Sequence, residues 1–363
     1  MQVKEITDIV EAFAPLALQA GYDNAGLVCG SYAGEVQGVL LCTDVTEAVV
    51  DEAIRERCNL VISHHPLIFQ GIKNLRPENA VNRCLVKAIQ NDLHIYAAHT
   101  NMDSVAGGVS GRMADKLGLI RQRVLQPEGA LYSLSFYTPA AEAERVRNAV
   151  LEAGGGHIGN YSRCSFNAEG TGTFLPLENS RPYCGELHKL HAEKEVKTEI
   201  TVPEYRLNDS IRAIRENHPY EEPVWNVVKL HTPNPVTGLG IIGALPEAED
   251  PLFFLKRVRD IFGCGVIRHT ACGASRVQTV ALCGGAGASL IHRAIREKAD
   301  VFLSGDFKYH EFFQAENRII LADIGHYESE RYTKEIFYEL ITKKMPKFAV
   351  QFSKVNTNPT NYL

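Results

Sequence analysis

The sequence predicts an α/β protein in which the two ends of the chain form one duplicated unit with parallel-rich sheets, interrupted by a ferredoxin-like α+β insert. Three observations lead to this prediction. Short apolar runs alternate with helical stretches near both ends of the chain. The two ends match each other without a gap, whereas the middle follows a different order of strands and helices. At 363 residues, the chain is also long enough for two or three domains.

The first alternating segment lies in the N-terminal third, behind an amphipathic stretch that carries Val3, Ile6, Val10 and Phe13 at helical spacing. The strands expected in this segment are 39–44, 60–63 and 94–100, and the helices are 47–57, 78–90 and 108–117. Such alternation implies a parallel sheet that is covered by helices on both faces.

The C-terminal third repeats this alternation. Its expected strands are 278–283, 301–304 and 319–323, and its last helix is 328–343. The motif Ala-Ile-Arg-Glu occurs at 53–56 and again at 294–297, and the same offset joins Ser63 to Ser304. Two amphipathic helices could share four residues by chance. Because the strand ends also match in register, we favour an internal duplication.

The middle of the chain differs from both ends. Its expected strands are 132–137, 198–202 and 225–230, its helices are 140–153 and 210–216, and the stretch between the first helix and the second strand is strand-rich. This is the order of a ferredoxin-like sandwich. Pro233 and Pro235 then mark a return linker. We therefore divide the chain into a first half-domain (1–124), an insert (125–232) and a second half-domain (233–363).

Composition excludes several classes of protein. The 38 basic and 43 acidic side chains give a net charge of −5, so we expect no nucleic acid partner. Nine cysteines without a Cys-x-x-Cys pair are typical of a reducing compartment, which predicts a cytoplasmic protein. No apolar run approaches the roughly 20 residues that span a bilayer, and we expect no membrane partner.

Polar residues follow the expected strands at the ends where a parallel sheet binds ligands. His64 and His65 follow the second strand, Asp103 lies just beyond the third, His326 follows the last, and Glu330 comes four residues later. Imidazole and carboxylate groups without a thiolate fit two divalent ions that share a bridging carboxylate better than one closed structural site. The sequence leaves open which carboxylate bridges, and we consider Asp103 for that role. Zinc, iron, manganese and cobalt all fit this ligand set.

Other residues have weaker predictions. His99 precedes Asp103, and we expect it to be a proton shuttle or a supporting partner of a ligand. Gly284, Gly285 and Gly287 follow a strand, so their amides could hold an anion; the alternative is a tight turn that needs glycine.

Two further positions carry side chains capable of chemistry. Asp306 falls where the duplication would place His65, so we expect it to line the same cleft. His188 and His191 are spaced as one helical turn, which we interpret as a solvated face.

Five separated motifs resemble the NGG-one-interacting-factor-three-like family, whose bacterial members are labelled GTP cyclohydrolase type 2 homologs. In order along the chain they are DNAGL at 23–27, SHHPL at 63–67, AHTNMD at 98–103, SGDFKYH at 304–310 and DIGHYESE at 323–330. The resemblance covers both ends of the chain. The insert, with GHIGNY at 156–161 and HPYE at 218–221, is similar to the extra domain of the longer members, which resembles CutA and PII regulatory proteins.

The resemblance implies a duplicated α/β fold with a dinuclear zinc or iron centre, assembled into a ring-like homohexamer. The metal ligands that it implies are His64, His65, Asp103, His326 and Glu330. We expect a metal-dependent hydrolase that acts on a nucleotide such as GTP. The alternative is a non-enzymatic metal-handling or regulatory scaffold. An open coordination position would favour the hydrolase, and a closed shell of ligands would favour the scaffold.

Overall fold

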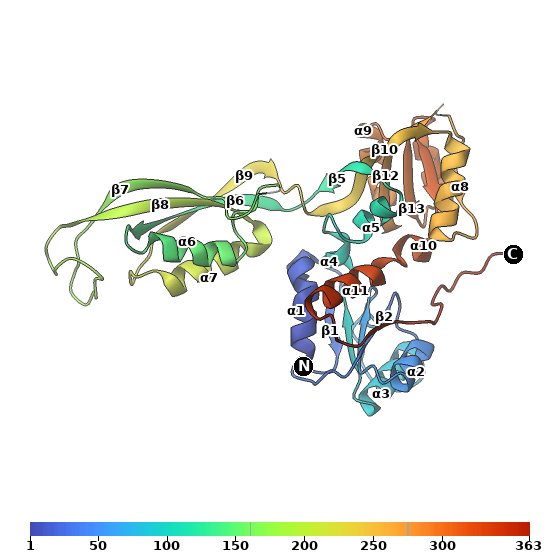
Figure 1. Ribbon diagram of the computed structural model, residues 1–363, viewed down its shortest axis with the longest axis horizontal. Helices are drawn as coiled ribbons and strands as arrows, with labels where there is room; N and C mark the ends of the chain where they lie inside the picture. Colours follow the sequence, from blue (N-terminus) through green and yellow to red (C-terminus); the bar gives the residue numbers. More distant parts are fainter. Residues whose placement is uncertain (160, 274–275) are drawn as a thin grey trace. The chain divides into compact units, whose positions relative to one another are not determined.

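The computed structural model describes residues 1–159, 161–273 and 276–363, so Asn160 of the 156–161 motif lies outside the described residues (Figure 1). The chain forms two compact units. One comprises Met1–Gln126 together with Val236–Leu363, and the other comprises Pro127–Pro235. The larger unit contains two sheets and the smaller unit contains one. Within the described residues, no helix is long and apolar enough to cross a membrane.

The first sheet of the larger unit has five strands. In spatial order they are β1 (Gly26–Cys29), β4 (His94–Ala97), β3 (Leu60–Ser63), β2 (Val39–Cys42) and β15 (Val350–Phe352). All neighbours are parallel except β1, which pairs antiparallel with β4. Leu41 and Ile62 pack toward α1 (Val3–Phe13) and α11 (Thr333–Lys344).

The opposite face of this sheet is covered by α2 (Glu47–Arg55) and α3 (Ala80–Gln90). Leu40 and Val61 point to these helices because successive side chains of a strand alternate between faces. With apolar residues on both faces, the strands read as continuous apolar runs in the sequence.

The second sheet has six strands. In spatial order they are β11 (Arg268–His269), β14 (Ile320–Asp323), β13 (Val301–Gly305), β12 (Val277–Ala286), β10 (Gly238–Glu249) and β5 (Ile120–Pro127). The central β12, β13 and β14 are parallel, whereas β10 pairs antiparallel with β12 and β11 pairs antiparallel with β14. One face packs on α5 (Val109–Lys116) and α8 (Pro251–Phe262), and the other packs on α9 (Ile291–Arg296).

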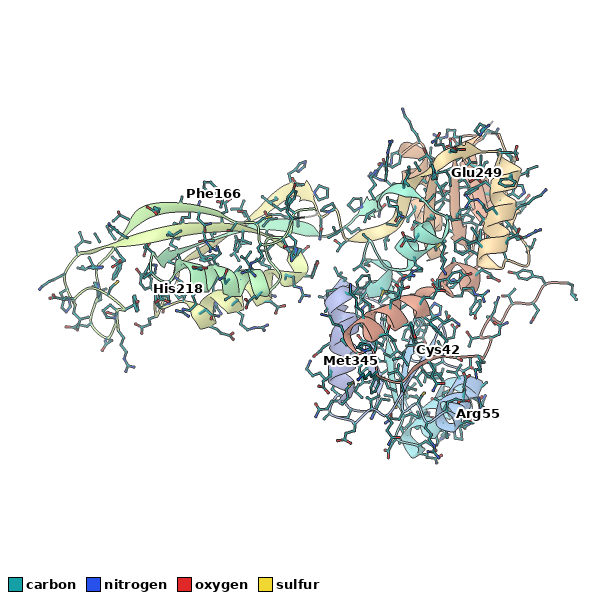
Figure 2. All side chains as sticks on the ribbon, in the orientation of Figure 1. Cys42, Arg55, Phe166, His218, Glu249 and Met345 are labelled. Atoms are coloured by element: carbon teal, nitrogen blue, oxygen red, sulfur yellow. The ribbon has the colours of Figure 1, made fainter. Side chains whose placement is uncertain are left out.

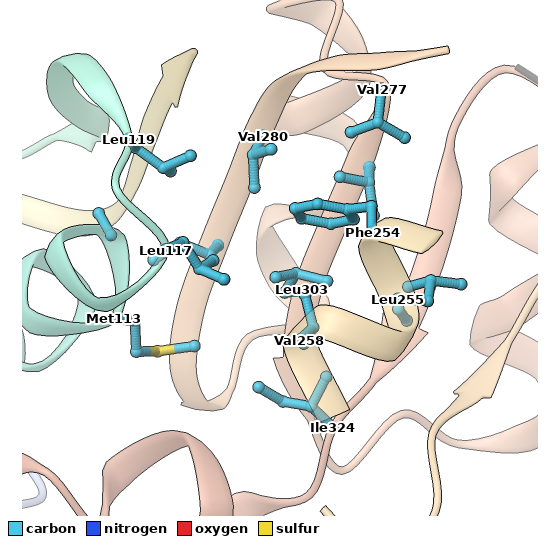
Figure 3. Close-up of a cluster of buried hydrophobic side chains, with 14 of the residues drawn as sticks. Met113, Leu117, Leu119, Phe254, Leu255, Val258, Val277, Val280, Leu303 and Ile324 are labelled. Atoms are coloured by element: carbon cyan, nitrogen blue, oxygen red, sulfur yellow. The ribbon is translucent and has the colours of Figure 1, made fainter. Parts of the chain in front are cut away.

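Local sequence explains the bounds of α8. The Asp250 side chain accepts hydrogen bonds from the amides of Leu252 and Phe253, and Gly263 ends the helix in the left-handed conformation. Phe254 and Val258 of this helix are buried against the sheet, as Figure 3 shows.

The two sheets share a register. Leu41 pairs with Ile62 in the first sheet, and Leu282 pairs with Leu303 in the second. The same number of residues separates Leu41 from Leu282 and Ile62 from Leu303. The pairing of β2 with β3 in the first sheet therefore has the same register as the pairing of β12 with β13 in the second.

Short helices follow the strands at the edge where the predicted site residues lie. Helix α4 (Thr100–Asp103) follows β4, and α10 (His326–Glu330) follows β14. The remaining short elements are the 3-10 helices η1 (Leu16–Leu18), η2 (Glu204–Arg206), η3 (Ala288–Leu290) and η4 (Tyr309–Ala315).

The smaller unit is one antiparallel sheet with two helices. Its elements in chain order are β6 (Ala130–Pro139), α6 (Ala143–Glu152), β7 (Phe166–Phe174), β8 (His191–Pro203), α7 (Leu207–Asn217) and β9 (Trp225–Pro233). The strands lie in the order β7-β8-β6-β9, and α6 and α7 cover one face (Figure 1). Figure 2 labels the exposed Phe166 at the start of β7 and His218 just beyond α7, where His218 contacts the Tyr137 carbonyl at 2.8 Å.

Three expected elements differ in the structure. The strand expected at 94–100 ends at Ala97, because α4 begins at Thr100. The helix expected at 328–343 is divided into α10 and α11. The helical spacing read from His188 and His191 was wrong, since β8 begins at His191.

Candidate metal centre

The structure brings the five predicted ligand residues together in the larger unit. His64 and His65 directly follow β3, and Asp103 is the last residue of α4. His326 and Glu330 are the first and last residues of α10, one helical turn apart, so both face the same way. The carboxyl ends of parallel strands in both sheets thus supply these side chains, either directly or through the short helix that follows the strand.

Glu330 lies at the centre of the cluster. Its Oε1 is 3.6 Å from His64 Nε2, whereas Oε2 is 3.0 Å from His65 Nε2 and 3.1 Å from His326 Nε2. Asp103 Oδ1 lies 3.7 Å from His64 Nε2. Among the described residues of this cluster, three groups of side chains have ligand atoms that all lie within 4.8 Å of one another: His64 with Asp103 and Glu330, His65 with His326 and Glu330, and His64 with His65 and His99. Of the two carboxylates, Glu330 belongs to two of these groups and Asp103 to one.

The histidines are oriented through their Nδ1 atoms. These atoms contact Asp44 Oδ1 at 2.7 Å for His65, Asp306 Oδ2 at 2.8 Å for His326, and the Ala98 carbonyl oxygen at 3.0 Å for His64. Partners of this kind fix the tautomer and direct Nε2 to the cluster, as is usual for histidine ligands of metals.

Several buried polar atoms of the cluster lack a hydrogen bond. Among the described residues, seven buried side-chain nitrogen or oxygen atoms have no partner, and three of them are His64 Nε2, Asp103 Oδ1 and Glu330 Oε2. Leaving such a group unpaired costs about 1–3 kcal/mol. A divalent cation between His64 and Asp103 would satisfy the first two atoms, and one beside His65 and His326 would satisfy Glu330 Oε2, so these residues fit metal ions.

Electrostatics in the metal-free cluster favour protonated imidazoles. Burial opposes the charge on His65, yet the close Asp44 and Glu330 carboxylates raise its pKa to about 10. The Glu330 carboxylate beside it is the main cause that raises the pKa of His326 to about 9. Burial raises the pKa of Asp103 to about 7. Burial alone would also raise the pKa of Glu330, but the surrounding histidines hold it well below its usual range.

His99 lies beside this cluster. Its ring centroid is 5.3 Å from that of His64 and 5.2 Å from that of His65. Its Nδ1 contacts Asp23 Oδ1 at 2.8 Å, and the other oxygen of Asp23 accepts from the Thr100 amide at 3.0 Å and from the Thr100 hydroxyl. Burial would raise the pKa of Asp23, but the hydrogen bonds from His99 and Thr100 hold it below its ordinary value. The His99 ring is therefore held beside the cluster through its Nδ1 atom.

The amides of the glycine loop, which we considered as an anion site, contact serine hydroxyls in the structure. The amides of Gly284, Gly285 and Gly287 donate to the hydroxyls of Ser110, Ser329 and Ser304 at 3.2, 2.9 and 2.9 Å. All three amides are thus engaged in this structure and none faces an open anion site. Gly285 has φ +61°, and an added Cβ would collide with Glu330 Oε1. The glycine is needed for the close approach of a carboxylate.

Three carboxylates contact histidine Nδ1 atoms at or beside the cluster, and the sequence predicts them to different degrees. Asp306 was expected to line the cleft, and it contacts His326. Asp44 follows β2 at the same edge as His64, so the strand-end argument could have found it. Asp23 precedes His99 by 76 residues, and no spacing signal joins the two.

A cavity of about 530 Å³ opens beside His65 and His326. Its other lining residues include Arg268, Asp306, Tyr327 and Tyr362. The His326 side chain is 38% exposed, whereas that of Glu330 is 4% exposed. The cluster is therefore buried on the Glu330 side and accessible on the His326 side.

Comparisons with known proteins identify the family of this chain. The family described as Duf34/NIF3 (NGG1p interacting factor 3) matches residues 1–359. Two relatives named GTP cyclohydrolase 1 type 2 homolog, from Halalkalibacterium halodurans and Bacillus subtilis, are 37% and 34% identical, each over 99% of this chain and 98% of the relative. A solved Bacillus cereus protein related to NIF3 is 34% identical with a TM-score of 0.86, covering 100% of this chain and 99% of that one. The chain belongs to the Duf34/NIF3 family.

Proposed function

We propose that this chain binds two divalent ions, zinc or iron, at the cluster around Glu330. The observation that carries the proposal is that each Glu330 oxygen faces a different group of ligands, while buried atoms of both groups lack hydrogen bonds. The ligands of one ion would be His64, Asp103 and Glu330, and those of the other would be His65, His326 and Glu330.

We further propose that the centre catalyses hydrolysis of a nucleotide-like substrate, as the name of the relatives suggests. Two divalent ions supply Lewis acidity and lower the pKa of water. His99 would accept or donate a proton at Nε2, since Asp23 occupies its Nδ1. Arg268 and the tyrosines of the adjoining cavity would hold the substrate through its anionic and ring parts.

The exposure of His326 favours an enzyme over a metal-storing scaffold. A scaffold would gain from a closed shell of ligands, whereas hydrolysis needs a position that water and substrate can reach. The cavity reaches His65 and His326 from the open side. This supports a hydrolase as the first candidate and leaves the regulatory scaffold as the second.

The wider architecture is part of the same proposal. We infer that the shared register of the two sheets reflects a duplication, that the smaller unit is a ferredoxin-like insert related to PII proteins, and that the protein assembles as a cytoplasmic, ring-like homohexamer. Light scattering on the purified protein tests the assembly, since a mass other than six chains contradicts it.

Metal analysis paired with a nucleotide screen tests the function. We expect about two transition-metal ions per chain from the centre and release of product from GTP or a related nucleotide by the zinc- or iron-loaded protein. Glu330→Gln should lose both metal and turnover, whereas Glu316→Gln, a change on an exposed turn of the same unit, should keep both. A metal-loaded protein that turns over no nucleotide would favour the scaffold.

A further inference from the structure

A second cluster of metal-ligating side chains lies in the smaller unit, outside the centre described above. Cys184, His191 and Glu193 offer a sulfur, a nitrogen and an oxygen that all lie within 4.8 Å of one another. His191 Nε2 is 2.9 Å from Glu193 Oε2. Unlike the groups of the first cluster, this group includes a thiol.

The fold explains how these residues meet. His191 and Glu193 are two positions apart on β8, so both point to the same face of the sheet. Cys184 lies in the connection from β7 to β8, and this connection returns over the start of β8. Gly185 has φ +85°, and a Cβ there would lie only 3.0 Å from His191 Cβ. The backbone thus passes directly over the imidazole, and the glycine makes this approach possible.

Further groups on this face are anionic or aromatic. Glu195 is the next residue of β8 on the same face, and its Oε1 accepts a hydrogen bond of 2.8 Å from the Tyr220 hydroxyl. The Tyr220 oxygen is also 4.0 Å from Cys184 Sγ. The Phe174 ring lies 5.3 Å from that of His191 and covers one side of it. A thiol and one carboxylate therefore lie beside the imidazole, and a second carboxylate follows on the same face of β8, an arrangement that a cation would stabilise.

We propose that Cys184, His191 and Glu193 form a binding site for a thiophilic divalent cation of the zinc type. Sulfur, imidazole and carboxylate are the ligands that zinc takes in tetrahedral sites, and a thiolate selects zinc over magnesium or calcium. Ligand atoms around tetrahedral zinc are roughly 3.3–3.8 Å apart, given bond lengths of about 2.0–2.3 Å. The three ligand atoms already lie within 4.8 Å of one another, and small side-chain movements would bring them to this spacing.

The site would keep a fourth position open. The side chains of His191 and Glu193 are 29% and 28% exposed, so solvent or a ligand can reach the ion. A cavity of about 390 Å³ lies beside it, lined by Phe174, Tyr183, Glu195 and Tyr220 among others. A small molecule with a metal-binding group could therefore contact the ion and the aromatic rings together. The smaller unit would then sense a ligand through its metal.

Cobalt spectroscopy separates this site from the centre around Glu330. Cobalt(II) bound to a thiolate gives an intense near-ultraviolet charge-transfer band, whereas the residues assigned to the first centre include no thiolate. We expect the full-length, reduced, metal-free protein to develop this band on addition of cobalt, and Cys184→Ser to lose it together with about one bound ion per chain. His64→Ala should keep the band.

Cys164→Ser is the matched control, because Cys164 lies in the same unit and its sulfur contacts the Ser162 carbonyl oxygen at 3.9 Å. This variant should keep the band. Glu193→Gln keeps the thiol and should weaken cobalt binding about tenfold or more. Circular dichroism confirms that each variant is folded. Absence of the band in wild type with excess cobalt, or its persistence in folded Cys184→Ser, would overturn the proposal.

Discussion

The backbone of Gly285 passes so close to the Glu330 carboxylate that an added Cβ would collide with Oε1. These residues come from β12 and α10, two elements that meet only in the folded unit. Because Glu330 is shared by both groups of predicted ligands, the room left by one glycine affects the whole centre.

Gly285→Ala should therefore reduce metal binding at both positions. The methyl group would displace the carboxylate, and alanine at φ +61° adds roughly 1–2 kcal/mol of backbone strain. Gly170→Ala is the control, because an added Cβ there meets nothing within 4 Å and no left-handed φ is required. Elemental analysis of the folded proteins measures the effect. Two retained ions at the centre in Gly285→Ala would show that Glu330 is not a ligand.

Removing each carboxylate in turn should distinguish the bridging residue. Glu330→Gln should lose both ions, since its two oxygens face different groups. Asp103→Asn should mainly weaken the position shared with His64, by about 10–100-fold in affinity. Titration of the metal-free variants with zinc gives the number of ions at each affinity. Loss of both ions in Asp103→Asn alone would assign the bridge to Asp103.

Much of this centre could be predicted from the sequence, because ligands gather at the carboxyl ends of parallel strands. The positions of His64 and His65 follow from that rule, whereas His326 follows β14 of the second sheet, so its approach to them depends on how the two sheets pack. The bridging role proposed for Glu330 could not be predicted, since it depends on which way α10 turns after Gly325, at φ +92°. The partner of His99 could not be predicted either, because Asp23 lies in the loop before β1, far from His99 in the sequence.

The fold was predictable where periodicity is strong and less so elsewhere. Strands such as β3 are short, largely apolar and fully buried, and their bounds follow from the sequence. Strands β1, β5, β10 and β15 and helix α8 were not expected individually. Their apolar residues are fewer or mixed with charged ones, and they are stabilised by pairing and packing with distant segments.

Metal affinity should rise with pH. In the metal-free protein, the pKa values of His65 and His326 are raised to about 10 and about 9, so both rings carry a proton at neutral pH. A metal must displace these protons, so the affinity of the centre for metal increases with pH until the imidazoles have lost them. The raised pKa values also stabilise the metal-free fold below the ordinary histidine pKa of about 6.5, and this contribution is lost as pH rises through about 9 and 10.

The gap in unfolding temperature between metal-loaded and metal-free protein should consequently widen from about pH 6.5 to 9. Thermal unfolding across this range, with and without zinc, measures it. Removing one of the raised groups with His326→Asn should make the gap smaller and flatter with pH. A gap that narrows as pH rises would contradict protonated imidazoles in the metal-free centre.

Removing the proton-transferring ring should slow turnover without emptying the centre. His99→Asn should keep its metal, because the ring is not needed in either group around Glu330, and should lower kcat by about 10²-fold or more. Asp23→Asn should have a smaller effect of the same kind and should shift the pH profile of kcat, since Asp23 holds the His99 ring at Nδ1. Unchanged kcat in metal-loaded His99→Asn would leave His99 with a structural role.

Deleting the smaller unit should separate the two proposed metal sites. All predicted ligands around Glu330 lie in Met1–Gln126 and Val236–Leu363, and β5 and β10, which flank the deleted segment, are neighbours in one sheet. A variant that joins Gln126 to Val236 through a short Gly/Ser linker should fold, because closing a short loop between adjacent strands costs little entropy. It should keep the two ions of the centre and lose the cobalt–thiolate band that we assign to Cys184.

Elemental analysis and absorption spectra of the same sample give both results. A folded deletion variant without metal would mean that the insert contributes to the centre, and a deletion variant that keeps the band would place the thiolate elsewhere in the chain.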